Sequence, residues 1–372
     1  MTFTVVARNV KQEFERWTDA LEAANSLKPT LKSWFTDIRI FDGRELVWMY
    51  SKLRAHPEYI GPGTYNRLAR LFIEEGRTEA VSRQPWLIRQ QQLSWGERTY
   101  LMGVINVTPD SFSDGGQFNS PDKARQQASQ LLKAGIDILD IGGQSTRPGA
   151  EQISLGAELN RVIPVIEAIR QATDPELQQA IISVDTTRAT VARAAIEAGA
   201  DIINDVSGGT YEPEIFEVAA GSSTPIILMH LRGTPAMMQT LTEYDDLMAD
   251  IKEFLGQQID RATAAGVPRE LICLDPGIGF AKTYAQNLEI LRRLPDLAEL
   301  GCPLLVGVSR KSFIGWLLDQ PDPQQRDWGT AAACAAAVAG GADILRVHNG
   351  GAMVDVARVA DGIWRATPGS DA

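Results

Sequence analysis

The chain has 372 residues, of which 44% are hydrophobic and 22% are charged, and its formal net charge is −11. This composition is ordinary for a globular protein, while the length exceeds one small domain and suits a large α/β barrel with additional structure. The acidic balance argues against a nucleic-acid partner, because binding to phosphate backbones usually needs a basic face. Any basic cluster in this chain is therefore expected to be local.

The cysteines and the apolar segments argue against secreted and membrane-spanning classes. Cys273, Cys302 and Cys334 are widely spaced and form no CxxC pair, so neither a zinc site nor a disulfide framework is predicted. No apolar run approaches the ~18 residues needed to span a membrane, and the N-terminus turns charged too soon for a secretory signal. We therefore expect a cytoplasmic protein without a membrane partner.

Residues 1–84 differ from the rest and are predicted to form an N-terminal extension of unknown role. Five of the eight tryptophans lie before residue 96. Gln12–Leu27 and Thr64–Glu75 have the apolar spacing of helices, and Gly61-Pro62-Gly63 breaks the chain between them. We therefore expect a mostly helical extension, followed by a main domain over residues 85–372.

A hairpin is predicted at the start of the main domain. Its arms would be Trp86–Leu93 and Arg98–Leu101, joined by a turn at Ser94–Glu97. The second arm leads into the first strand of the main domain. If that domain is a barrel, the hairpin could close its N-terminal mouth.

From about residue 100 onward, short apolar runs alternate with longer helical segments. Continuous hydrophobicity is typical of strands that are buried on both faces, as in a parallel sheet covered by helices. Eight strand–helix repeats over about 270 residues match the size and strand count of a TIM barrel, a (β/α)8 fold of the α/β class. The eight runs are Leu101–Ile105, Ile136–Ile141, Ile181–Val184, Ile202–Val206, Pro225–Met229, Leu271–Leu274, Pro303–Val308 and Ile344–Val347.

Three of these repeats share one pattern, at Gly135–Asp140, Gly199–Asn204 and Gly341–Arg346. A glycine ends a helix in the left-handed conformation, an apolar strand follows, and the strand closes on a polar residue. A doubly wound open sheet is the alternative architecture, but it rarely supplies eight such units without a glycine-rich nucleotide fingerprint. No GxGxxG follows the first strand. The barrel is therefore favoured.

Polar residues stand at nearly every predicted strand end, which is where (β/α)8 barrels build their active sites. Arg147, Arg346 and His348 would form a local cationic cluster, and the amide of Asn106 would lie nearby. Arginine forks match phosphate oxygens in pairs. An anionic substrate, most simply a diphosphate, is therefore predicted.

A second group of strand-end residues suits a flat heterocycle. Carboxylates and an amide can accept hydrogen bonds from the N–H groups of a 2-amino-4-oxo-pyrimidine edge, and an amine can donate to a ring oxygen or nitrogen. The neighbouring Asp205 would face the other side of its strand and is expected to support the structure instead. The group consists of Asp185, Asn204, Asp275 and Lys311.

Several of these residues also have ordinary structural interpretations. Asn106 could cap a turn, and Asp275 followed by Pro-Gly is common turn chemistry. His230 could equally be a satisfied structural histidine. The roles of Lys282 and Arg310 stay open. The set of strand-end residues, and not any one motif, indicates the function.

From about residue 98 to residue 366 the chain closely resembles dihydropteroate synthases. Two stretches are highly specific for that family: NVTPDSFSDGG at 106–116 and STRPG at 145–149. The other matches follow in the family's order: SVDT at 183–186, INDVSG at 203–208, MHLRGTP at 229–235, DPGIGFAK at 275–282, SRK at 309–311 and RVH at 346–348.

The resemblance implies a reaction that uses Mg²⁺ and yields 7,8-dihydropteroate and diphosphate. The substrates would be 6-hydroxymethyl-7,8-dihydropterin diphosphate and 4-aminobenzoate. By the family's pattern, Arg346 would pack on the pterin ring as well as meet phosphate. The other pterin-binding residues would be Asp185, Asn204, Met229, Asp275, Gly279 and Lys311.

The same pattern implies the remaining parts of the site. Mg²⁺ would lie near Asn106, and the family forms a homodimer through its later barrel helices. Diphosphate would be bound by Asn106, Arg346 and His348, with Thr146 and Arg147 completing its site and that of 4-aminobenzoate. The aminobenzoate pocket would be shaped by Phe112, Pro148, Phe280, Lys311 and Ser312.

The chain departs from the commonest family pattern in three places. Gln144 stands where glutamate is usual, Asn349 stands where aspartate is usual, and residues 1–84 have no counterpart in the minimal pattern. Two alternative functions are consistent with part of this pattern. A corrinoid-dependent methyltransferase would share the barrel and the pterin carboxylates but has no diphosphate to hold. A non-catalytic paralogue would bind pterin or a partner protein without turnover.

Overall fold

A computed structural model describes the backbone of residues 3–7, 10–14, 37–42 and 45–51, and residues 83–107, 120–145 and 150–365. The chain divides into two compact units, Met1–Ser82 and Arg83–Ala372.

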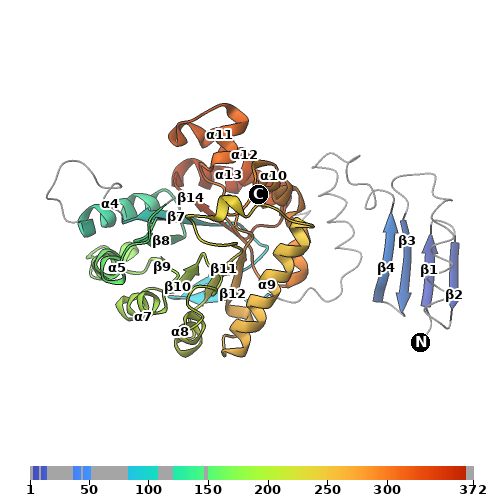
Figure 1. The fold of residues 1–372 in the computed structure, drawn as a ribbon, viewed down its shortest axis with the longest axis horizontal. Helices are drawn as coiled ribbons and strands as arrows, with labels where there is room; N and C mark the ends of the chain where they lie inside the picture. Colours follow the sequence, from blue (N-terminus) through green and yellow to red (C-terminus); the bar gives the residue numbers. More distant parts are fainter. Residues whose placement is uncertain are drawn as a thin grey trace. The chain divides into compact units, whose positions relative to one another are not determined.

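In the first unit, the described residues form a four-stranded antiparallel sheet in the order β2-β1-β3-β4 (Figure 1). The strands are β1 (Phe3–Ala7), β2 (Val10–Phe14), β3 (Asp37–Asp42) and β4 (Glu45–Ser51).

The expectation of a mostly helical extension is wrong at the start of its first predicted helix. Residues 12–14 lie in β2, where Gln12 pairs with Val5 and Phe14 with Phe3 of β1. Local periodicity cannot reveal this pairing, because the partner strand supplies the backbone hydrogen bonds. The remaining residues of the two predicted helices, 15–27 and 64–75, lie outside the described part of the chain.

The second unit is an eight-stranded parallel barrel. Its strands follow one another in the order β12-β11-β10-β9-β8-β7-β14-β13, and a parallel bridge between Leu274 and Leu304 joins the two ends. Each of the eight apolar runs forms a strand, so the prediction of a TIM barrel is confirmed. The strands are β7 (Tyr100–Asn106), β8 (Ile138–Gly142), β9 (Ile181–Asp185), β10 (Ile202–Asp205), β11 (Ile226–Met229), β12 (Ile272–Asp275), β13 (Leu305–Val306) and β14 (Ile344–Val347).

Helices surround these strands (Figure 1). The predicted left-handed glycines are present before three strands, with φ of 91° at Gly135, 112° at Gly199 and 96° at Gly341. The α-helices are α4 (Ser120–Lys133), α5 (Leu155–Arg170), α6 (Pro175–Gln178), α7 (Ala189–Ala198), α8 (Ile215–Ser222), α9 (Leu247–Ala264), α10 (Tyr284–Arg293), α11 (Ser312–Leu318), α12 (Asp327–Ala339) and α13 (Gly350–Trp364). Short 3-10 helices are η4 (Met238–Thr240), η5 (Arg269–Leu271), η6 (Leu294–Leu300) and η7 (Pro323–Arg326). No helix in the described ranges is long and apolar enough to cross a membrane.

The N-terminal mouth of the barrel is closed by the hairpin of β5 (Trp86–Ile88) and β6 (Gln91–Leu93). Trp86, Ile88 and Leu93 are buried in one apolar cluster with a residue from each barrel strand, such as Met102 and Ile344. The role predicted for the hairpin is therefore confirmed.

The hairpin is shorter than predicted, and its turn was misplaced. The turn lies at Arg89 and Gln90, whose φ angles are 47° and 65°, instead of at Ser94–Glu97. Two consecutive residues with positive φ match the twist of a tight two-residue hairpin. Trp95, from the predicted turn, packs edge-on against Trp86 with ring centroids 5.0 Å apart.

Candidate active site

The interior of the barrel changes from apolar to polar along the strands. Side chains two residues apart on a strand point the same way, so Ile138 and Asp140 share the inner face of β8, and Ile202 and Asn204 share that of β10. The first residue of each pair belongs to the apolar cluster at the closed mouth. The second is 0% exposed for Asp140 and 2% exposed for Asn204. The polar end is therefore the carboxyl end of the strands, as the sequence predicted.

Arg346 is held between two carboxylates on neighbouring strands. Its Nε lies 2.6 Å from Oδ2 of Asp140, and its Nη2 lies 2.7 Å from Oδ2 of Asp185. The amide of Asn204 donates to both oxygens of Asp140, at 3.4 and 3.3 Å. Sequence reasoning placed Arg346 chiefly in a cationic cluster, whereas its guanidinium lies among the carboxylates.

Asp140 is the main residue that the predicted site lacked. It bridges Arg346 and Asn204, two residues that were predicted. A signal for it was present, because Asp140, Asn204 and Arg346 occupy the same position of the repeated glycine–strand pattern. Its place inside an apolar run conceals the role, because such a run is typical of a buried strand.

Burial shapes the protonation of this pocket. Burial raises the pKa of Asp185 to about 7, although Arg346 acts to lower it. Burial also raises the pKa of Asp275 and lowers that of Lys311 to about 8. Burial lowers the pKa of Arg346, but Asp140 and Asp185 outweigh that effect and raise it overall. The ionised pocket therefore depends on pairing between its own charges.

Asp275 and Lys311 lie on the side formed by the loop after β12. Asp275 Oδ1 accepts a hydrogen bond from the Gly277 backbone N–H at 2.7 Å. Lys311 donates to the carbonyl of Ile278, and its Nζ lies 4.6 Å from the centre of the Phe280 ring. The predicted residues Asp275, Phe280 and Lys311 are thus brought together.

Gly279 is required by this close approach. Its φ is +85°, and a Cβ at this position would lie 2.9 Å from Cδ of Lys311. A side chain here would combine backbone strain with a displacement of Lys311. Met229, which is 2% exposed, packs in a cluster with the partly buried Phe280. Ser312 begins α11 directly after Lys311.

His348 and Asn106 lie at the ends of adjacent strands β14 and β7. The backbone N–H of His348 donates to Ser309 Oγ at 3.2 Å, and its ring Nδ1 lies 3.1 Å from the same oxygen. Asn106 is half-buried at the end of β7. The predicted residues Phe112, Thr146, Arg147 and Pro148 lie outside the described residues.

His230 and Lys282 form a buried pair beneath the loop after β12. Lys282 Nζ lies 2.9 Å from His230 Nδ1 and donates to the Phe280 carbonyl at 2.9 Å. Burial lowers the pKa of His230 to about 2, with the Lys282 charge adding to the effect. A neutral His230 can accept from Lys282, and the pair supports the backbone that carries Phe280.

Asp205 and Gln144 take structural roles. Asp205 accepts hydrogen bonds from the N–H groups of Ser207 and Gly209, at 2.8 and 2.6 Å, so its predicted supporting role is confirmed. Gln144 accepts from the Ile153 N–H at 2.8 Å and donates to the Glu151 carbonyl at 2.9 Å. Its amide thus fastens the segment that follows the STRPG stretch.

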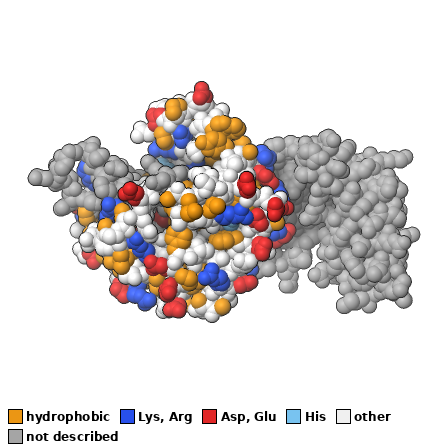
Figure 2. Space-filling view, viewed as in Figure 1, with side chains coloured by type: hydrophobic (Ala, Val, Ile, Leu, Met, Phe, Trp, Pro, Cys, Tyr) orange, Lys and Arg blue, Asp and Glu red, His pale blue; other side chains and the backbone are white. Residues whose placement is uncertain are grey.

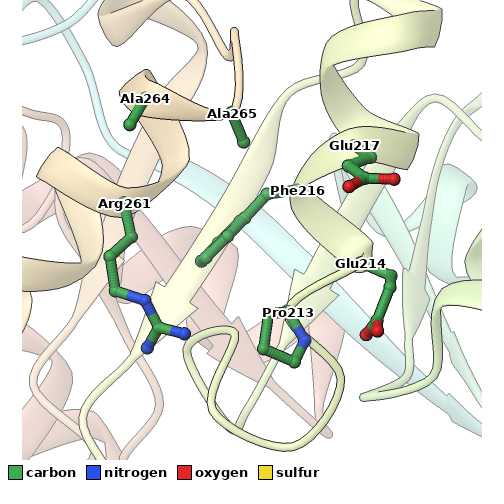
Figure 3. A pocket seen from close by; sticks show the side chains of 7 residues that line it. All are labelled: Pro213, Glu214, Phe216, Glu217, Arg261, Ala264 and Ala265. Atoms are coloured by element: carbon green, nitrogen blue, oxygen red, sulfur yellow. The ribbon is translucent and has the colours of Figure 1, made fainter.

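A surface hollow of about 340 Å³ lies between α8 and α9 (Figure 3). It is outside the barrel and includes none of the strand-end residues. Two carboxylates and one arginine line it, which makes it mixed in charge. The lining residues are Pro213, Glu214, Phe216, Glu217, Arg261, Ala264 and Ala265.

The fold and this site define a barrel enzyme with a cluster of buried charged and polar side chains at the carboxyl ends of its strands. Residues 102–348 match the sequence model of the family described as "Pterin binding enzyme". The dihydropteroate synthase of Synechocystis sp. is 58% identical over 281 residues, covering 76% of this chain and 96% of that protein. The Bacillus subtilis dihydropteroate synthase is 45% identical over 269 residues, covering 72% of this chain and 90% of that protein.

Solved structures agree with these relatives. The Yersinia pestis dihydropteroate synthase, solved with a sulfonamide drug, is 43% identical with a TM-score of 0.70, covering 76% of this chain and 100% of that one. The Xanthomonas albilineans enzyme in complex with 7,8-dihydropteroate is 38% identical with a TM-score of 0.67, with the same coverages. The chain belongs to the dihydropteroate synthase family, which confirms the resemblance seen in its motifs.

Proposed function

We propose that this chain is the transferase that joins 6-hydroxymethyl-7,8-dihydropterin diphosphate to 4-aminobenzoate, releasing 7,8-dihydropteroate and diphosphate in folate synthesis. The observation that carries the proposal is the buried network of Asp140, Asp185, Asn204 and Arg346 at the carboxyl ends of the strands. It occurs in a chain that is 58% identical to a dihydropteroate synthase.

The pterin would bind against the carboxylates and the amide. Asp275 uses one oxygen, Oδ1, for the Gly277 N–H, and its other oxygen can accept from an N–H of the pterin. Asp185 and Asn204 offer acceptors on the neighbouring strands, and Lys311 supplies the donor. Met229 and Gly279 would border the ring, and a side chain at position 279 would displace Lys311.

The diphosphate would bind between the ends of β7 and β14, at Asn106 and His348. Thr146 and Arg147 would complete this site from the loop after β8. Arg346 lies below them on β14 and adds a cation that its two carboxylates already orient. The 4-aminobenzoate would lie toward Phe280, Lys311 and Ser312. Phe112, from the segment after β7, and Pro148, from the segment after β8, would also contribute.

Mg²⁺ fits this arrangement as a companion of the diphosphate. Among the described residues, no group of three His, Cys, Asp or Glu side chains could bind a metal. Mg²⁺ commonly keeps its waters and binds substrate phosphates with one or two protein oxygens, and the Asn106 amide oxygen would be such a ligand. Bound Mg²⁺ would offset the charge on the departing diphosphate.

The chain's own contribution to the reaction is electrostatic. When diphosphate leaves, the pterin methylene carries positive charge that the ring shares. The carboxylates of Asp185 and Asp275 would stabilise that charge from fixed positions. The amine of 4-aminobenzoate is unprotonated at neutral pH and attacks without a strong general base. The burial of the pocket helps to keep out water, which would otherwise trap the cation.

We further propose a homodimer through the later barrel helices. Trp328 on α12 is 88% exposed, and Val359 and Ile363 on α13 are each 65% exposed. These helices pack against each other, and apolar side chains also gather over the neighbouring α11 (Figure 2). Large exposed apolar patches often mark protein interfaces. Trp328→Ser is expected to shift the mass in light scattering from dimer toward monomer.

The three cysteines are buried and unpaired, which supports a reducing, cytoplasmic location.

The reaction itself is tested by measuring diphosphate release with both substrates and with each omitted. We expect release to require 4-aminobenzoate. A protein that binds the pterin diphosphate in calorimetry but never releases diphosphate would be a non-catalytic paralogue.

A further inference from the structure

The residue before Lys311 has an unusual backbone conformation. Arg310 has a φ of +58°, in the left-handed region that residues with a side chain rarely adopt. Such a conformation persists where surrounding contacts over-determine it. Arg310 separates Ser309, which contacts His348, from Lys311, which contacts the loop after β12. Its conformation therefore sets the direction of two side chains of the site.

Three contacts from one short segment hold Arg310 in place. Its backbone N–H donates to Thr330 Oγ1 at 3.0 Å, and its carbonyl accepts from Arg326 Nη1 at 3.0 Å. Its guanidinium forms a two-point ion pair with Asp327, with Nε–Oδ1 at 2.8 Å and Nη2–Oδ2 at 3.0 Å. Paired arginine–carboxylate bonds fix geometry as well as charge.

Asp327 also binds the loop after β14. The amide Nδ2 of Asn349 donates to Asp327 Oδ2 at 2.8 Å. This is the same oxygen that accepts from Arg310 Nη2. Asn349 directly follows His348, so one carboxylate contacts both loops, the loop of Lys311 and the loop of His348. An amide at position 349 can donate to Asp327, whereas an ionised carboxylate there could not.

We propose that Asp327 is a positioning residue that clamps the loops after β13 and β14 together through Arg310 and Asn349. The clamp fixes Lys311, on the pterin and aminobenzoate side, relative to His348, on the diphosphate side. The proposal rests on the proposed function, because it concerns the alignment of those two subsites. Asp327 acts through its neighbours and needs no contact with substrate.

The test is a charge swap. Asp327→Asn removes the carboxylate that contacts Arg310 and Asn349. Adding Asn349→Asp places a carboxylate at the other residue of the 327–349 contact. We expect kcat/KM for the pterin diphosphate to fall at least about fivefold in Asp327→Asn, since misplaced reacting groups can cost up to about a hundredfold. The double variant is expected to recover most of that loss. The single variant Asn349→Asp completes the double-mutant cycle, which measures the coupling between positions 327 and 349.

Asp322→Asn is the matched control. Asp322 caps η7 on the same segment, and its side chain accepts from the Gln324 N–H instead of contacting either loop. It loses the same charge near Arg310 and is expected to retain wild-type kinetics. Rates are taken per active site, after active-site titration, so that loss of folded protein alone leaves them unchanged.

A double variant no more active than Asp327→Asn, or an Asp327→Asn enzyme with wild-type kinetics, would overturn the clamp. If Asp327→Asn does not fold, Asn349→Ala removes one contact of the clamp and must still raise the KM for the pterin diphosphate. A wild-type enzyme without activity would instead refute the proposed function, so the two failures are distinguishable.

Discussion

Replacing Arg346 by alanine removes a cation that contacts both Asp140 and Asp185. The side chains of these two residues are 0% and 7% exposed, and that of Arg346 is 22% exposed. Breaking a buried pair by removing one partner typically costs about 3–5 kcal/mol. Protonation of Asp185 recovers part of this, so we expect about 3 kcal/mol. At roughly 2–4 °C per kcal/mol for a domain near this size, the melting temperature should fall by about 6–12 °C.

The pH dependence of the Arg346→Ala variant has a defined sign. Burial raises the pKa of Asp185 from 3.8 to about 7 even with Arg346 present. A carboxyl with a raised pKa in the folded state binds its proton more tightly there than in the unfolded chain. Its contribution to stability is therefore lost as pH rises from about 4 through 7. Without Arg346 this loss should be larger, and melting curves at several pH values measure it.

The assay combines melting curves with steady-state rates. Loss of a charge-assisted contact to substrate costs about 1.5–3 kcal/mol, or roughly ten- to a hundredfold in kcat/KM. Arg346→Lys should recover part of the stability and little of the rate, because one ammonium cannot contact both carboxylates as the guanidinium does. Arg125→Ala, which removes an exposed arginine from a 3.2 Å pair with Asp122, is the control and should change neither. Wild-type rates and melting in Arg346→Ala would refute the assigned network.

Three further predictions concern the site residues and the division of the chain into two units. Asp275→Asn should weaken pterin binding in calorimetry at least about tenfold without lowering the melting temperature, because an amide presents a donor to the donors of the ring. Unchanged affinity for the pterin would remove Asp275 from the site. Sulfonamides that mimic 4-aminobenzoate should compete with it and bind more tightly when diphosphate is present, because Thr146 and Arg147 would serve both the diphosphate site and the aminobenzoate site. Equal affinity with and without diphosphate would contradict that coupling. A chain of residues 83–372 should fold and keep most of its turnover per folded molecule. It must begin no later than Arg83, whose Nη1 lies 2.5 Å from Oδ2 of the buried Asp343. A folded but inactive product would mean that the first unit contributes to the site.

The barrel could be predicted because its strands are buried on both faces and read as continuous apolar runs. The site could be predicted in part because strand ends such as Asp185 and Asp275 carry polar residues that a buried sheet otherwise excludes. The turn of the hairpin was missed because Arg89 and Gln90 are not typical residues for positive φ. Its position follows from the packing of Trp86 and Leu93 against the barrel.

Other contacts depend on distances that sequence does not encode. Asp140 and Arg346 are far apart in the chain and meet only because the barrel brings β8 and β14 to either side of β7. The interpretation of Asn349 needed the position of Asp327 on α12. In the first unit, β2 forms because β1 pairs with it, and local spacing alone favoured a helix there.

The most direct test of the account is the formation of 7,8-dihydropteroate by the purified full chain. The pterin diphosphate, 4-aminobenzoate and Mg²⁺ are mixed with the enzyme, and both the pteroate and the diphosphate are quantified over time. We expect equal amounts of the two products and a strong loss of both in Arg346→Ala. Diphosphate release without dihydropteroate, or no product from a folded wild-type protein, would contradict it.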